Sequence, residues 1–322
     1  MRRGVALMGG LGIVVGLVWA VSTQLHGRAP GSKYVVPRTA WGDPDLQGQW
    51  NSQTSTPLER PLSGPLAEKE TLSDEEAESL EVKHLADGDR PPAEGDPGTY
   101  NSFWFDRGKG VNRTSLIIDP PDGRVPAYTP EAEQRLAAER AARATRGPAD
   151  SYADLPAWTR CITRGWNGIG SNYSSNTQIF QSPGYVVVLQ ELIHEPRIIP
   201  LNAGEALPSS VQQWLGDSRG HWEGDTLVVE TRNFDPRSSY RGSSPALVLT
   251  ERYTRTSADE IDYRFTMHDP TTYVKDWTVG RPMRREAERI TVFEYACHEG
   301  NIAMTGILAG ARREEKEAAA KR

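Results

Sequence analysis

Carboxylates on expected apolar strand faces are the residues of this sequence best suited to do chemistry. In the expected strand 246–256, side-chain alternation places Glu251 on the face that should be buried. In the expected strand 185–193, Glu191 takes the same kind of position, and His194 follows on the other face. A carboxylate that faces a core must be ion-paired or lie in a polar cavity.

Two interpretations of these side chains stay open. The first is a structural ion pair, which is the more common environment of such a carboxylate. Its candidate partners are Arg197, Arg219 and Arg252. The second is a polar cavity inside a β-barrel, lined together by Glu251, Glu191 and His194. A carboxylate and an imidazole in one cavity can move protons in general acid–base catalysis, so these three residues are catalytic candidates.

A second candidate site is the run Cys297-His298-Glu299, expected where the last strand gives way to the final helix. Glu299 near a helix start is favoured by the helix dipole, which needs no function. Alternatively, His298 or Glu299 acts as a base at the mouth of a barrel. A Cys297 nucleophile paired with His298 is disfavoured, because neighbouring residues on a strand point to opposite faces.

Candidate ligand-binding residues are polar or aromatic and lie in the expected strands and turns: Arg197, Arg219, His221, Trp222, Asp269 and Trp277. The chain also contains nine tryptophans, and burial in the core is the default for most of them. Alternatively, five of the tryptophans and the aromatic run 100–105 line a pocket for a planar apolar ligand. The five are Trp158, Trp166, Trp214, Trp222 and Trp277.

Missing motifs argue against several classes of site. The six histidines show no HxH, HxxxH or HExxH spacing, so a metal would need ligands from separate strands. Neither a GxGxxG nor a GxxxxGKS/T phosphate loop occurs, and there is no GxSxG elbow. The formal net charge is −6 and no basic stripe is present, which argues against nucleic-acid binding. We therefore expect no metal, no cofactor and no nucleic-acid partner.

The two cysteines, Cys161 and Cys297, lie 136 positions apart. In an oxidising compartment a disulfide is the first interpretation. It would stabilise the fold by about 4–5 kcal/mol in the chain-entropy model. The alternatives are two buried thiols or a single nucleophile.

Residues 1–29 form a separate segment. Arg2 and Arg3 precede an apolar run over 4–21. This pattern predicts a signal peptide cleaved after Ser22, or an uncleaved anchor near the lower length limit for spanning a bilayer. In either case we expect the rest of the protein to be extracytoplasmic, either periplasmic or secreted. An uncleaved segment would hold it at the inner membrane.

The rest of the chain divides by composition into a Pro/Gly-rich arm over 30–157, a β body over 158–311 and a charged tail over 312–322. The arm holds two helical patterns, 73–85 with a capping box and 131–145 with a proline before it. Little of the arm can form a core of its own. We therefore expect it to wrap around the body rather than fold as an independent domain.

Short strand-like runs follow one another through the β body, with no helical period between them. The stretch 214–234 is the centre of this series. The runs are 177–180, 185–193, 197–201, 225–234, 246–256, 260–269, 272–279 and 289–296. Short connections favour an antiparallel meander that curls or closes, since closure removes exposed edges. We expect a mainly β fold, either a curled antiparallel sheet or a lipocalin-like barrel, with peripheral helices that include 299–320.

Three long motifs carry a resemblance to known proteins: GDSRGHWEGDTLVVETRNF, LTERYTRTSADEIDYRFTMHDPTTYVKDWT and EYACHEGN. With RCITRG and QSPGYVVVLQELIHEPRIIPL, they resemble a family of exported bacterial proteins of unknown function, over roughly residues 37 to 311. The resemblance implies an exported protein with a β-rich, lipocalin-like or sandwich body. It implies no activity and no catalytic residues.

Three functions are compatible with these observations. The first is binding of a small, largely apolar molecule in a cavity within the sheet. The second is a cofactor-independent acid–base enzyme, a lyase, isomerase or hydrolase, that uses a Glu/His pair. The third is an envelope scaffold without a small-molecule site. Buried charges that converge on one concave site would favour the enzyme, and a solid core would favour the scaffold.

Overall fold

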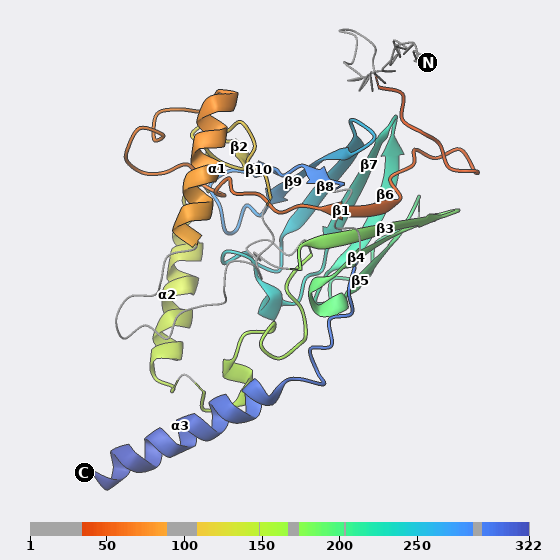
Figure 1. The fold of residues 1–322 in the computed structure, drawn as a ribbon. Helices are drawn as coiled ribbons and strands as arrows, with labels where there is room; N and C mark the ends of the chain where they lie inside the picture. Colours follow the sequence, from red (N-terminus) through yellow and green to blue (C-terminus); the bar gives the residue numbers. More distant parts are fainter. Residues whose placement is uncertain are drawn as a thin grey trace, which may run out of the picture. The chain divides into compact units, whose positions relative to one another are not determined.

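An antiparallel sheet of eleven strands dominates the fold (Figure 1), as seen in a computed structural model. The structure describes residues 34–88, 108–147, 149–166, 174–202, 204–285 and 292–321. The expected signal or anchor segment and the aromatic run 100–105 lie outside these ranges. Among the described residues, no helix has both the length and the apolar character needed to cross a bilayer.

The strands follow the order β5-β4-β3-β1-β11-β9-β8-β7-β6, and β10 joins β9 to β2. Their bounds are β1 Gly48–Asn51, β2 Ile117–Asp119, β3 Asn176–Ser182, β4 Tyr185–Gln190, β5 Pro196–Pro200, β6 Asp217–Glu223, β7 Thr226–Arg232, β8 Val248–Arg255, β9 Glu260–His268, β10 Trp277–Gly280 and β11 Met283–Arg284. The expected mainly β fold with a curled antiparallel sheet is confirmed.

The curl brings the two end strands, β5 and β6, together at one point. Leu201, just beyond β5, forms a single parallel bridge with Gly220 of β6, and the Asn202 N–H donates to the Gly220 carbonyl at 2.8 Å. A Cβ at Gly220 would lie 2.9 Å from side-chain carbons of Ile199 and Leu201, so this close approach requires glycine. No ladder continues from the bridge within the described strands, and the sheet is not closed.

Two hairpins form one half of the sheet. Between β6 and β7, Glu223 pairs with Thr226 around a two-residue turn, and Gly224 adopts a φ of 61° there. Between β8 and β9, the Thr256 N–H donates to the Glu260 carbonyl at 3.0 Å. The second hairpin is formed by the expected strands 246–256 and 260–269.

The core lies on the inner face of the curled sheet. Its fully buried side chains come from both halves of the sheet, as Ile179, Leu249 and Phe265 show. The Pro/Gly-rich arm contributes Trp50 and Ile117 to the same cluster through β1 and β2. The arm therefore supplies two strands and part of the core of the sheet.

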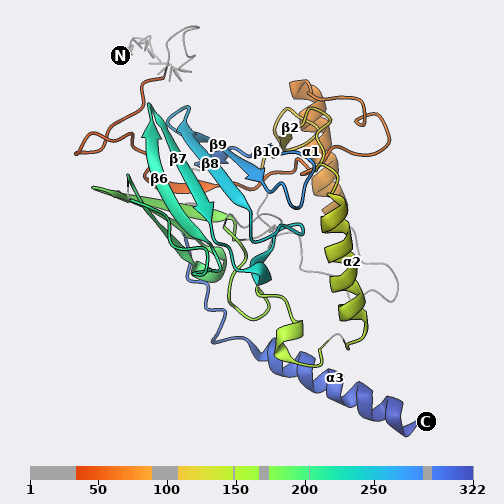
Figure 2. The same ribbon diagram turned by 180° about the vertical axis from the view of Figure 1, so that it is seen from behind.

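Two of the three helices that the structure describes form where the sequence shows a capping box or an initial proline. The three are α1 (Asp74–Gly88), α2 (Pro130–Ala144) and α3 (Ile302–Ala320). In front of α1, Ser73 Oγ accepts from the Glu76 N–H at 3.2 Å, and Glu76 Oε2 accepts from the Ser73 N–H at 2.9 Å. Figures 1 and 2 show α1 beside the β2–β10 end of the sheet and α3 leading away from the sheet.

Some expected boundaries are wrong. The strand expected over 185–193 ends at Gln190, because Ile193 and His194 adopt φ values of 65° and 56° that a strand cannot contain. No strand forms over 292–296, the described part of the last expected run. Conversely, β1 and β6 are strands that the expected runs do not include.

Candidate functional site

A buried charge pair joins the two halves of the sheet. Glu251 on β8 is fully buried, and Arg197 on β5 is 4% exposed. Arg197 Nη2 donates to Glu251 Oε1 at 2.9 Å, and Nη1 donates to Oε2 at 2.5 Å. The pair is bidentate, which is the strongest geometry for a guanidinium and a carboxylate. The curl of the sheet brings these two strands face to face.

Two tyrosines complete the hydrogen bonding of this carboxylate. The hydroxyls of Tyr253 and Tyr263 each donate to Glu251 Oε1 at 2.8 Å, and the Tyr253 hydroxyl also accepts from Arg197 Nη2 at 3.2 Å. Both carboxylate oxygens are therefore engaged. In the described part of the chain, Arg197 Nε has no hydrogen-bond partner.

The surroundings of Arg197 and Tyr253 shift the pKa values of both groups upward. Burial lowers the pKa of Arg197, but the Glu251 carboxylate more than offsets burial, and the net direction is upward. Burial raises the pKa of Tyr253 well above its ordinary value, and Glu251 raises it further. Arg197 stays charged and Tyr253 stays a donor across the physiological range. This arrangement is that of a structural ion pair.

The other catalytic candidates are not gathered around Glu251. His194 is exposed at the end of the short 3-10 turn η3 (Leu192–His194). Glu191 is buried and accepts from Asn176 Nδ2 at 2.6 Å. A proton relay between an exposed imidazole and a fully buried, doubly engaged carboxylate lacks the direct contact that general acid–base catalysis needs.

His298 and Glu299 lie in the turn before α3, and both are exposed. They are three and two residues from the Asn301 N-cap, and the structure describes no strand or barrel mouth at this place. The bases that the sequence suggested here face solvent rather than a concave site.

The candidate ligand-binding residues are dispersed over the sheet. Arg219 pairs with Asp217 at 3.2 Å on β6. His221 lies 3.2 Å from Glu223 on the exposed face of the same strand, and Trp222 is partly buried against the core. Trp277 is fully buried in the core cluster. These side chains do not share one pocket among the described residues.

Asp269 holds the turn that follows β9. Its carboxylate accepts from the Ser244 N–H at 2.6 Å, from Ser244 Oγ at 2.8 Å and from Thr271 Oγ1 at 2.9 Å. Burial raises the pKa of Asp269, but these hydrogen bonds outweigh burial, and the net direction is downward. Its surroundings are those of a structural anchor.

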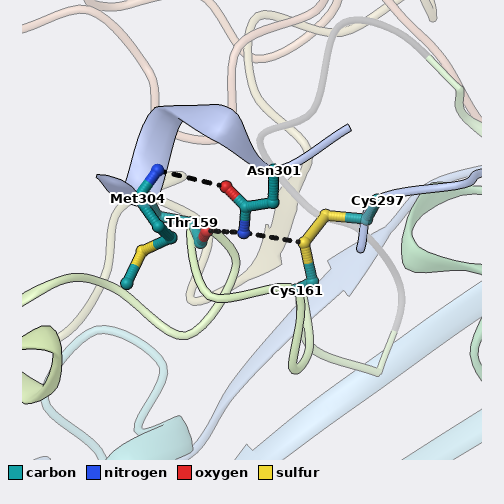
Figure 3. Close-up of a disulfide and its surroundings, with 5 residues drawn as sticks. All are labelled: Thr159, Cys161, Cys297, Asn301 and Met304. Carbon is teal, nitrogen blue, oxygen red and sulfur yellow. Dashed lines mark hydrogen bonds between the residues drawn. A yellow bond between two sulfur atoms is a disulfide. The ribbon is translucent and has the colours of Figure 1, made fainter. Parts of the chain in front are cut away.

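The disulfide between Cys161 and Cys297 is confirmed, with Cα atoms 5.7 Å apart. Figure 3 shows the disulfide and the residues around it. Asn301, the N-cap of α3, donates from Nδ2 to the Thr159 carbonyl at 3.0 Å and to Cys161 Sγ at 3.2 Å. The loop 156–166 is thus tied to the start of α3 by a covalent bond and by this side chain.

A pocket of about 330 Å³ lies beside this loop, where it meets the 3-10 turn η4 (Pro236–Ser238). Its lining residues are Pro156, Ala157, Trp158, Thr163, Arg164, Gly165, Trp166, Arg237, Ser238, Ser239 and Tyr240. Sequence reasoning pointed to Trp158 and Trp166 as residues that could line a pocket. It missed the polar residues, because loops 71 residues apart carry no shared periodic signal.

The aromatic wall of this pocket is fixed by the core. Trp166 is 4% exposed and meets Tyr240 edge-on, with ring centroids 5.2 Å apart. It also contacts Phe234 at 5.8 Å and Phe265 at 5.9 Å. Trp166 Nε1 is buried and has no hydrogen-bond partner in the part of the chain that the structure describes. The wall is therefore an aromatic cluster packed against the core.

Two arginines of the pocket differ in how their charge is balanced. Arg237 donates to Asp235 at 2.8 Å and 2.5 Å, and its guanidinium lies 4.6 Å from the Trp214 ring centre. Arg164 lies 4.7 Å from the Trp158 ring centre, and no ion-pair partner for it occurs among the described residues. As far as the structure describes the chain around this pocket, the Arg164 charge is therefore not neutralised by a carboxylate.

One carboxyl lies behind the pocket wall. The Glu195 side chain is hydrogen-bonded to Thr163, whose hydroxyl also accepts from the Gly165 N–H at 3.0 Å. Burial raises the pKa of Glu195, and the Thr163 hydrogen bond offsets only part of that rise. Glu195 directly follows the positive-φ pair at residues 193 and 194.

No group of three or more His, Cys, Asp or Glu side chains with a metal-binding arrangement occurs in the described ranges. Searches of family models, curated proteins and solved structures found no match to this chain. The resemblance to exported bacterial proteins therefore stays a prediction from the motifs.

Proposed function

We propose that this protein binds a small, planar and largely apolar molecule that carries one anionic group, in the pocket between residues 156–166 and 237–240. The observation that carries this proposal is the guanidinium of Arg164, which has no ion-pair partner among the residues that the structure describes. It is stacked on Trp158 in a pocket that Trp166 and Tyr240 also line. A flat apolar body fits such aromatic walls, and one carboxylate, sulfonate or phosphate matches the guanidinium.

The size and chemistry of the pocket support this proposal. A volume of about 330 Å³ lies at the small end of known ligand pockets. Such sites combine apolar walls with a few polar groups that fix orientation. Here those groups are the Arg164 guanidinium and the Thr163 hydroxyl. Arg237 contributes less, because Asp235 already neutralises it.

This location differs from the sheet cavity that the sequence suggested. On the inner face of the sheet, core side chains pack around the Arg197–Glu251 pair. The acid–base alternative draws no support from Glu251, whose oxygens are saturated by Arg197 and two tyrosines. Small-molecule binding is therefore proposed at the pocket of Arg164.

The proposal includes export from the cytoplasm, either as a released protein or as one held at the inner membrane by residues 4–21. The disulfide supports it, since structural disulfides persist in oxidising compartments. N-terminal sequencing of the protein recovered from its host tests it. A first residue near position 23 indicates cleavage, and an intact start in the membrane fraction indicates an anchor. A protein with an intact start in the cytosolic fraction contradicts export.

Two fluorescent probes of matched shape test the binding proposal. 8-Anilinonaphthalene-1-sulfonate carries a flat naphthalene ring and one anionic group, and N-phenyl-1-naphthylamine is its neutral counterpart. Arg164→Gln should weaken binding of the anionic probe by about tenfold or more, because a charge-assisted hydrogen bond contributes about 1.5–3 kcal/mol. Binding of the neutral probe should change little.

The matched control is Arg160→Gln. Arg160 also stacks on an aromatic ring, 5.4 Å from the centre of Tyr152, but it does not line the pocket. The Arg160→Gln variant should bind both probes as the wild type does. Equal loss in both variants, or no loss in Arg164→Gln, would contradict the proposal. Failure of the wild type to bind either probe would favour a scaffold.

A further inference from the structure

The outward face of β3, β4 and β5, called the apolar face below, lacks charged residues. Phe180, Val187 and Ile198 form one row across it, because Phe180 pairs with Val187 and Val187 pairs with Ile198. Phe180 is 44% exposed and Ile198 is 61% exposed. All ten outward positions of the three strands are apolar or uncharged polar residues.

Two further apolar pairs flank this row. Tyr185 lies opposite Pro200 on one side, and Leu189 lies opposite Pro196 on the other. The row and the two flanks make seven neighbouring apolar side chains in register. An antiparallel sheet that faces water normally carries polar residues on its outer face.

The other half of the same sheet follows that rule. On the outer faces of β7, β8 and β9, exposed ion pairs recur, such as Arg232–Glu230 and Arg264–Asp262. The sequence thus places charges where this sheet meets water, and it omits them on the apolar face. Contiguous exposed apolar patches of a few hundred Å² are often functional surfaces.

We propose that the apolar face is the interface through which two copies of this chain form a dimer. In a two-fold interface each patch packs against its own copy, so a charged patch would repel itself. The apolar face has no charge to repel. It also has no lysine or arginine to attract anionic lipid headgroups, and no charge pattern to match a charged partner.

The arrangement of the patch is compatible with two-fold packing. A two-fold axis along the Phe180–Val187–Ile198 row would set each of these side chains against its own counterpart. The Tyr185–Pro200 flank of one copy would then meet the Leu189–Pro196 flank of the other. Strand addition at the β5 edge is disfavoured, because Pro196 and Pro200 lack the N–H groups that a new strand needs.

The patch covers about 270 Å², about a third of what each partner of a standard interface buries, so it corresponds to the core of such an interface and not to the whole. Three strands about 4.8 Å apart and three alternate positions about 6.7 Å apart give a footprint of about 15 Å by 18 Å once side chains are included. A standard interface buries about 800 Å² on each partner and has an apolar core with a polar rim. The seven apolar side chains fill the core, and polar residues around them form the rim.

The test is the oligomeric state of the purified full chain, measured by sedimentation velocity over a concentration series. The wild type should be a dimer. Ile198→Lys should weaken dimerisation by about 100-fold or more, because it buries two like charges near the axis. Ile198 is exposed in the single chain, so the variant should still fold, as circular dichroism will show. Thr250→Lys, at an outward position of β8, is the matched control and should remain a dimer.

A second variant decides the outcome if Ile198→Lys does not fold. Both native cysteines are in the disulfide, so Val187→Cys introduces a single free thiol at the centre of the apolar face. A short bismaleimide should link this variant into a covalent dimer and should not link Thr250→Cys. A monomeric wild type would overturn the proposal, as would dimeric Ile198→Lys. The proposal would also be overturned by a monomer that co-floats with phosphatidylcholine vesicles in a density gradient, or by a monomer that purifies with a different protein bound to this face.

Discussion

Replacement of Glu251 by glutamine tests whether the buried charge pair holds the two halves of the sheet together. Glutamine keeps the volume of the side chain and an oxygen that can accept from Tyr253 and Tyr263. It removes the negative charge that balances Arg197, which is 4% exposed. The change therefore isolates one quantity, the free energy of a buried guanidinium without its counter-ion.

The expected loss is large. Breaking a buried ion pair by removal of one partner destabilises a protein by about 3–5 kcal/mol. At about 2–4 °C per kcal/mol for a chain of this order of size, the melting temperature should fall by about 6–20 °C. Arg197→Met should cost a similar amount, because it leaves the Glu251 carboxylate buried without its cation.

The double variant Glu251→Gln with Arg197→Met is the decisive comparison. It leaves no uncompensated charge, and glutamine still accepts from the tyrosine hydroxyls. Its stability should lie within about 1–2 kcal/mol of the wild type, far from the sum of the two single losses. Urea unfolding followed by circular dichroism measures all four proteins of the cycle.

The surface provides a matched control for this cycle. Glu230 pairs with Arg232 on the outer face of β7, and both side chains are nearly half exposed. Glu230→Gln should change the free energy of unfolding by less than about 0.5 kcal/mol. A loss below about 1 kcal/mol for Glu251→Gln, or additive losses in the double variant, would refute the buried-pair reasoning.

Three further outcomes follow from the described contacts. Replacing both Cys161 and Cys297 by serine should destabilise the protein by about 4–5 kcal/mol, and a reductant should lower the melting temperature of the wild type but not of this variant. Asp269→Asn should cost about 1–3 kcal/mol at neutral pH. The pKa of Asp269 is lowered from its ordinary 3.8, so the stability that its charge contributes is present above that pH and is lost as the pH falls through the lowered pKa. The free energy of unfolding of the wild type should therefore fall in acid by this amount, and that of Asp269→Asn should not. The pKa of Glu195 is raised from its ordinary 4.5. The stability that its protonated carboxyl contributes is therefore complete below that pH and is lost as the pH rises through the raised pKa. Melting temperatures against pH should show this decline in the wild type and not in Glu195→Gln, and parallel curves would contradict the burial of this carboxyl.

The sequence predicts the half of the fold in which local patterns decide the structure. Alternation in 246–256 and 260–269 predicts β8 and β9, and it places Glu251 on the face that the structure buries. The capping signals of α1 and α2 work in the same way, because each depends on residues a few positions apart.

Long-range features could not be predicted from those patterns. The choice of Arg197 among three candidate arginines depends on the curl that brings β5 to β8. Strand β1 is short and begins at Gly48, so its place between β3 and β11 is decided by tertiary pairing rather than by propensity. The pocket of Arg164 combines a disulfide-tied loop with a distant 3-10 turn, and nothing in the sequence links the two.

A crystal structure of the protein saturated with 8-anilinonaphthalene-1-sulfonate is the most direct test of ligand binding at Arg164. The sulfonate should contact the Arg164 guanidinium, and the rings should lie against Trp158, Trp166 or Tyr240. A probe bound on the inner face of the sheet, or an empty pocket in a saturated crystal, would contradict the account.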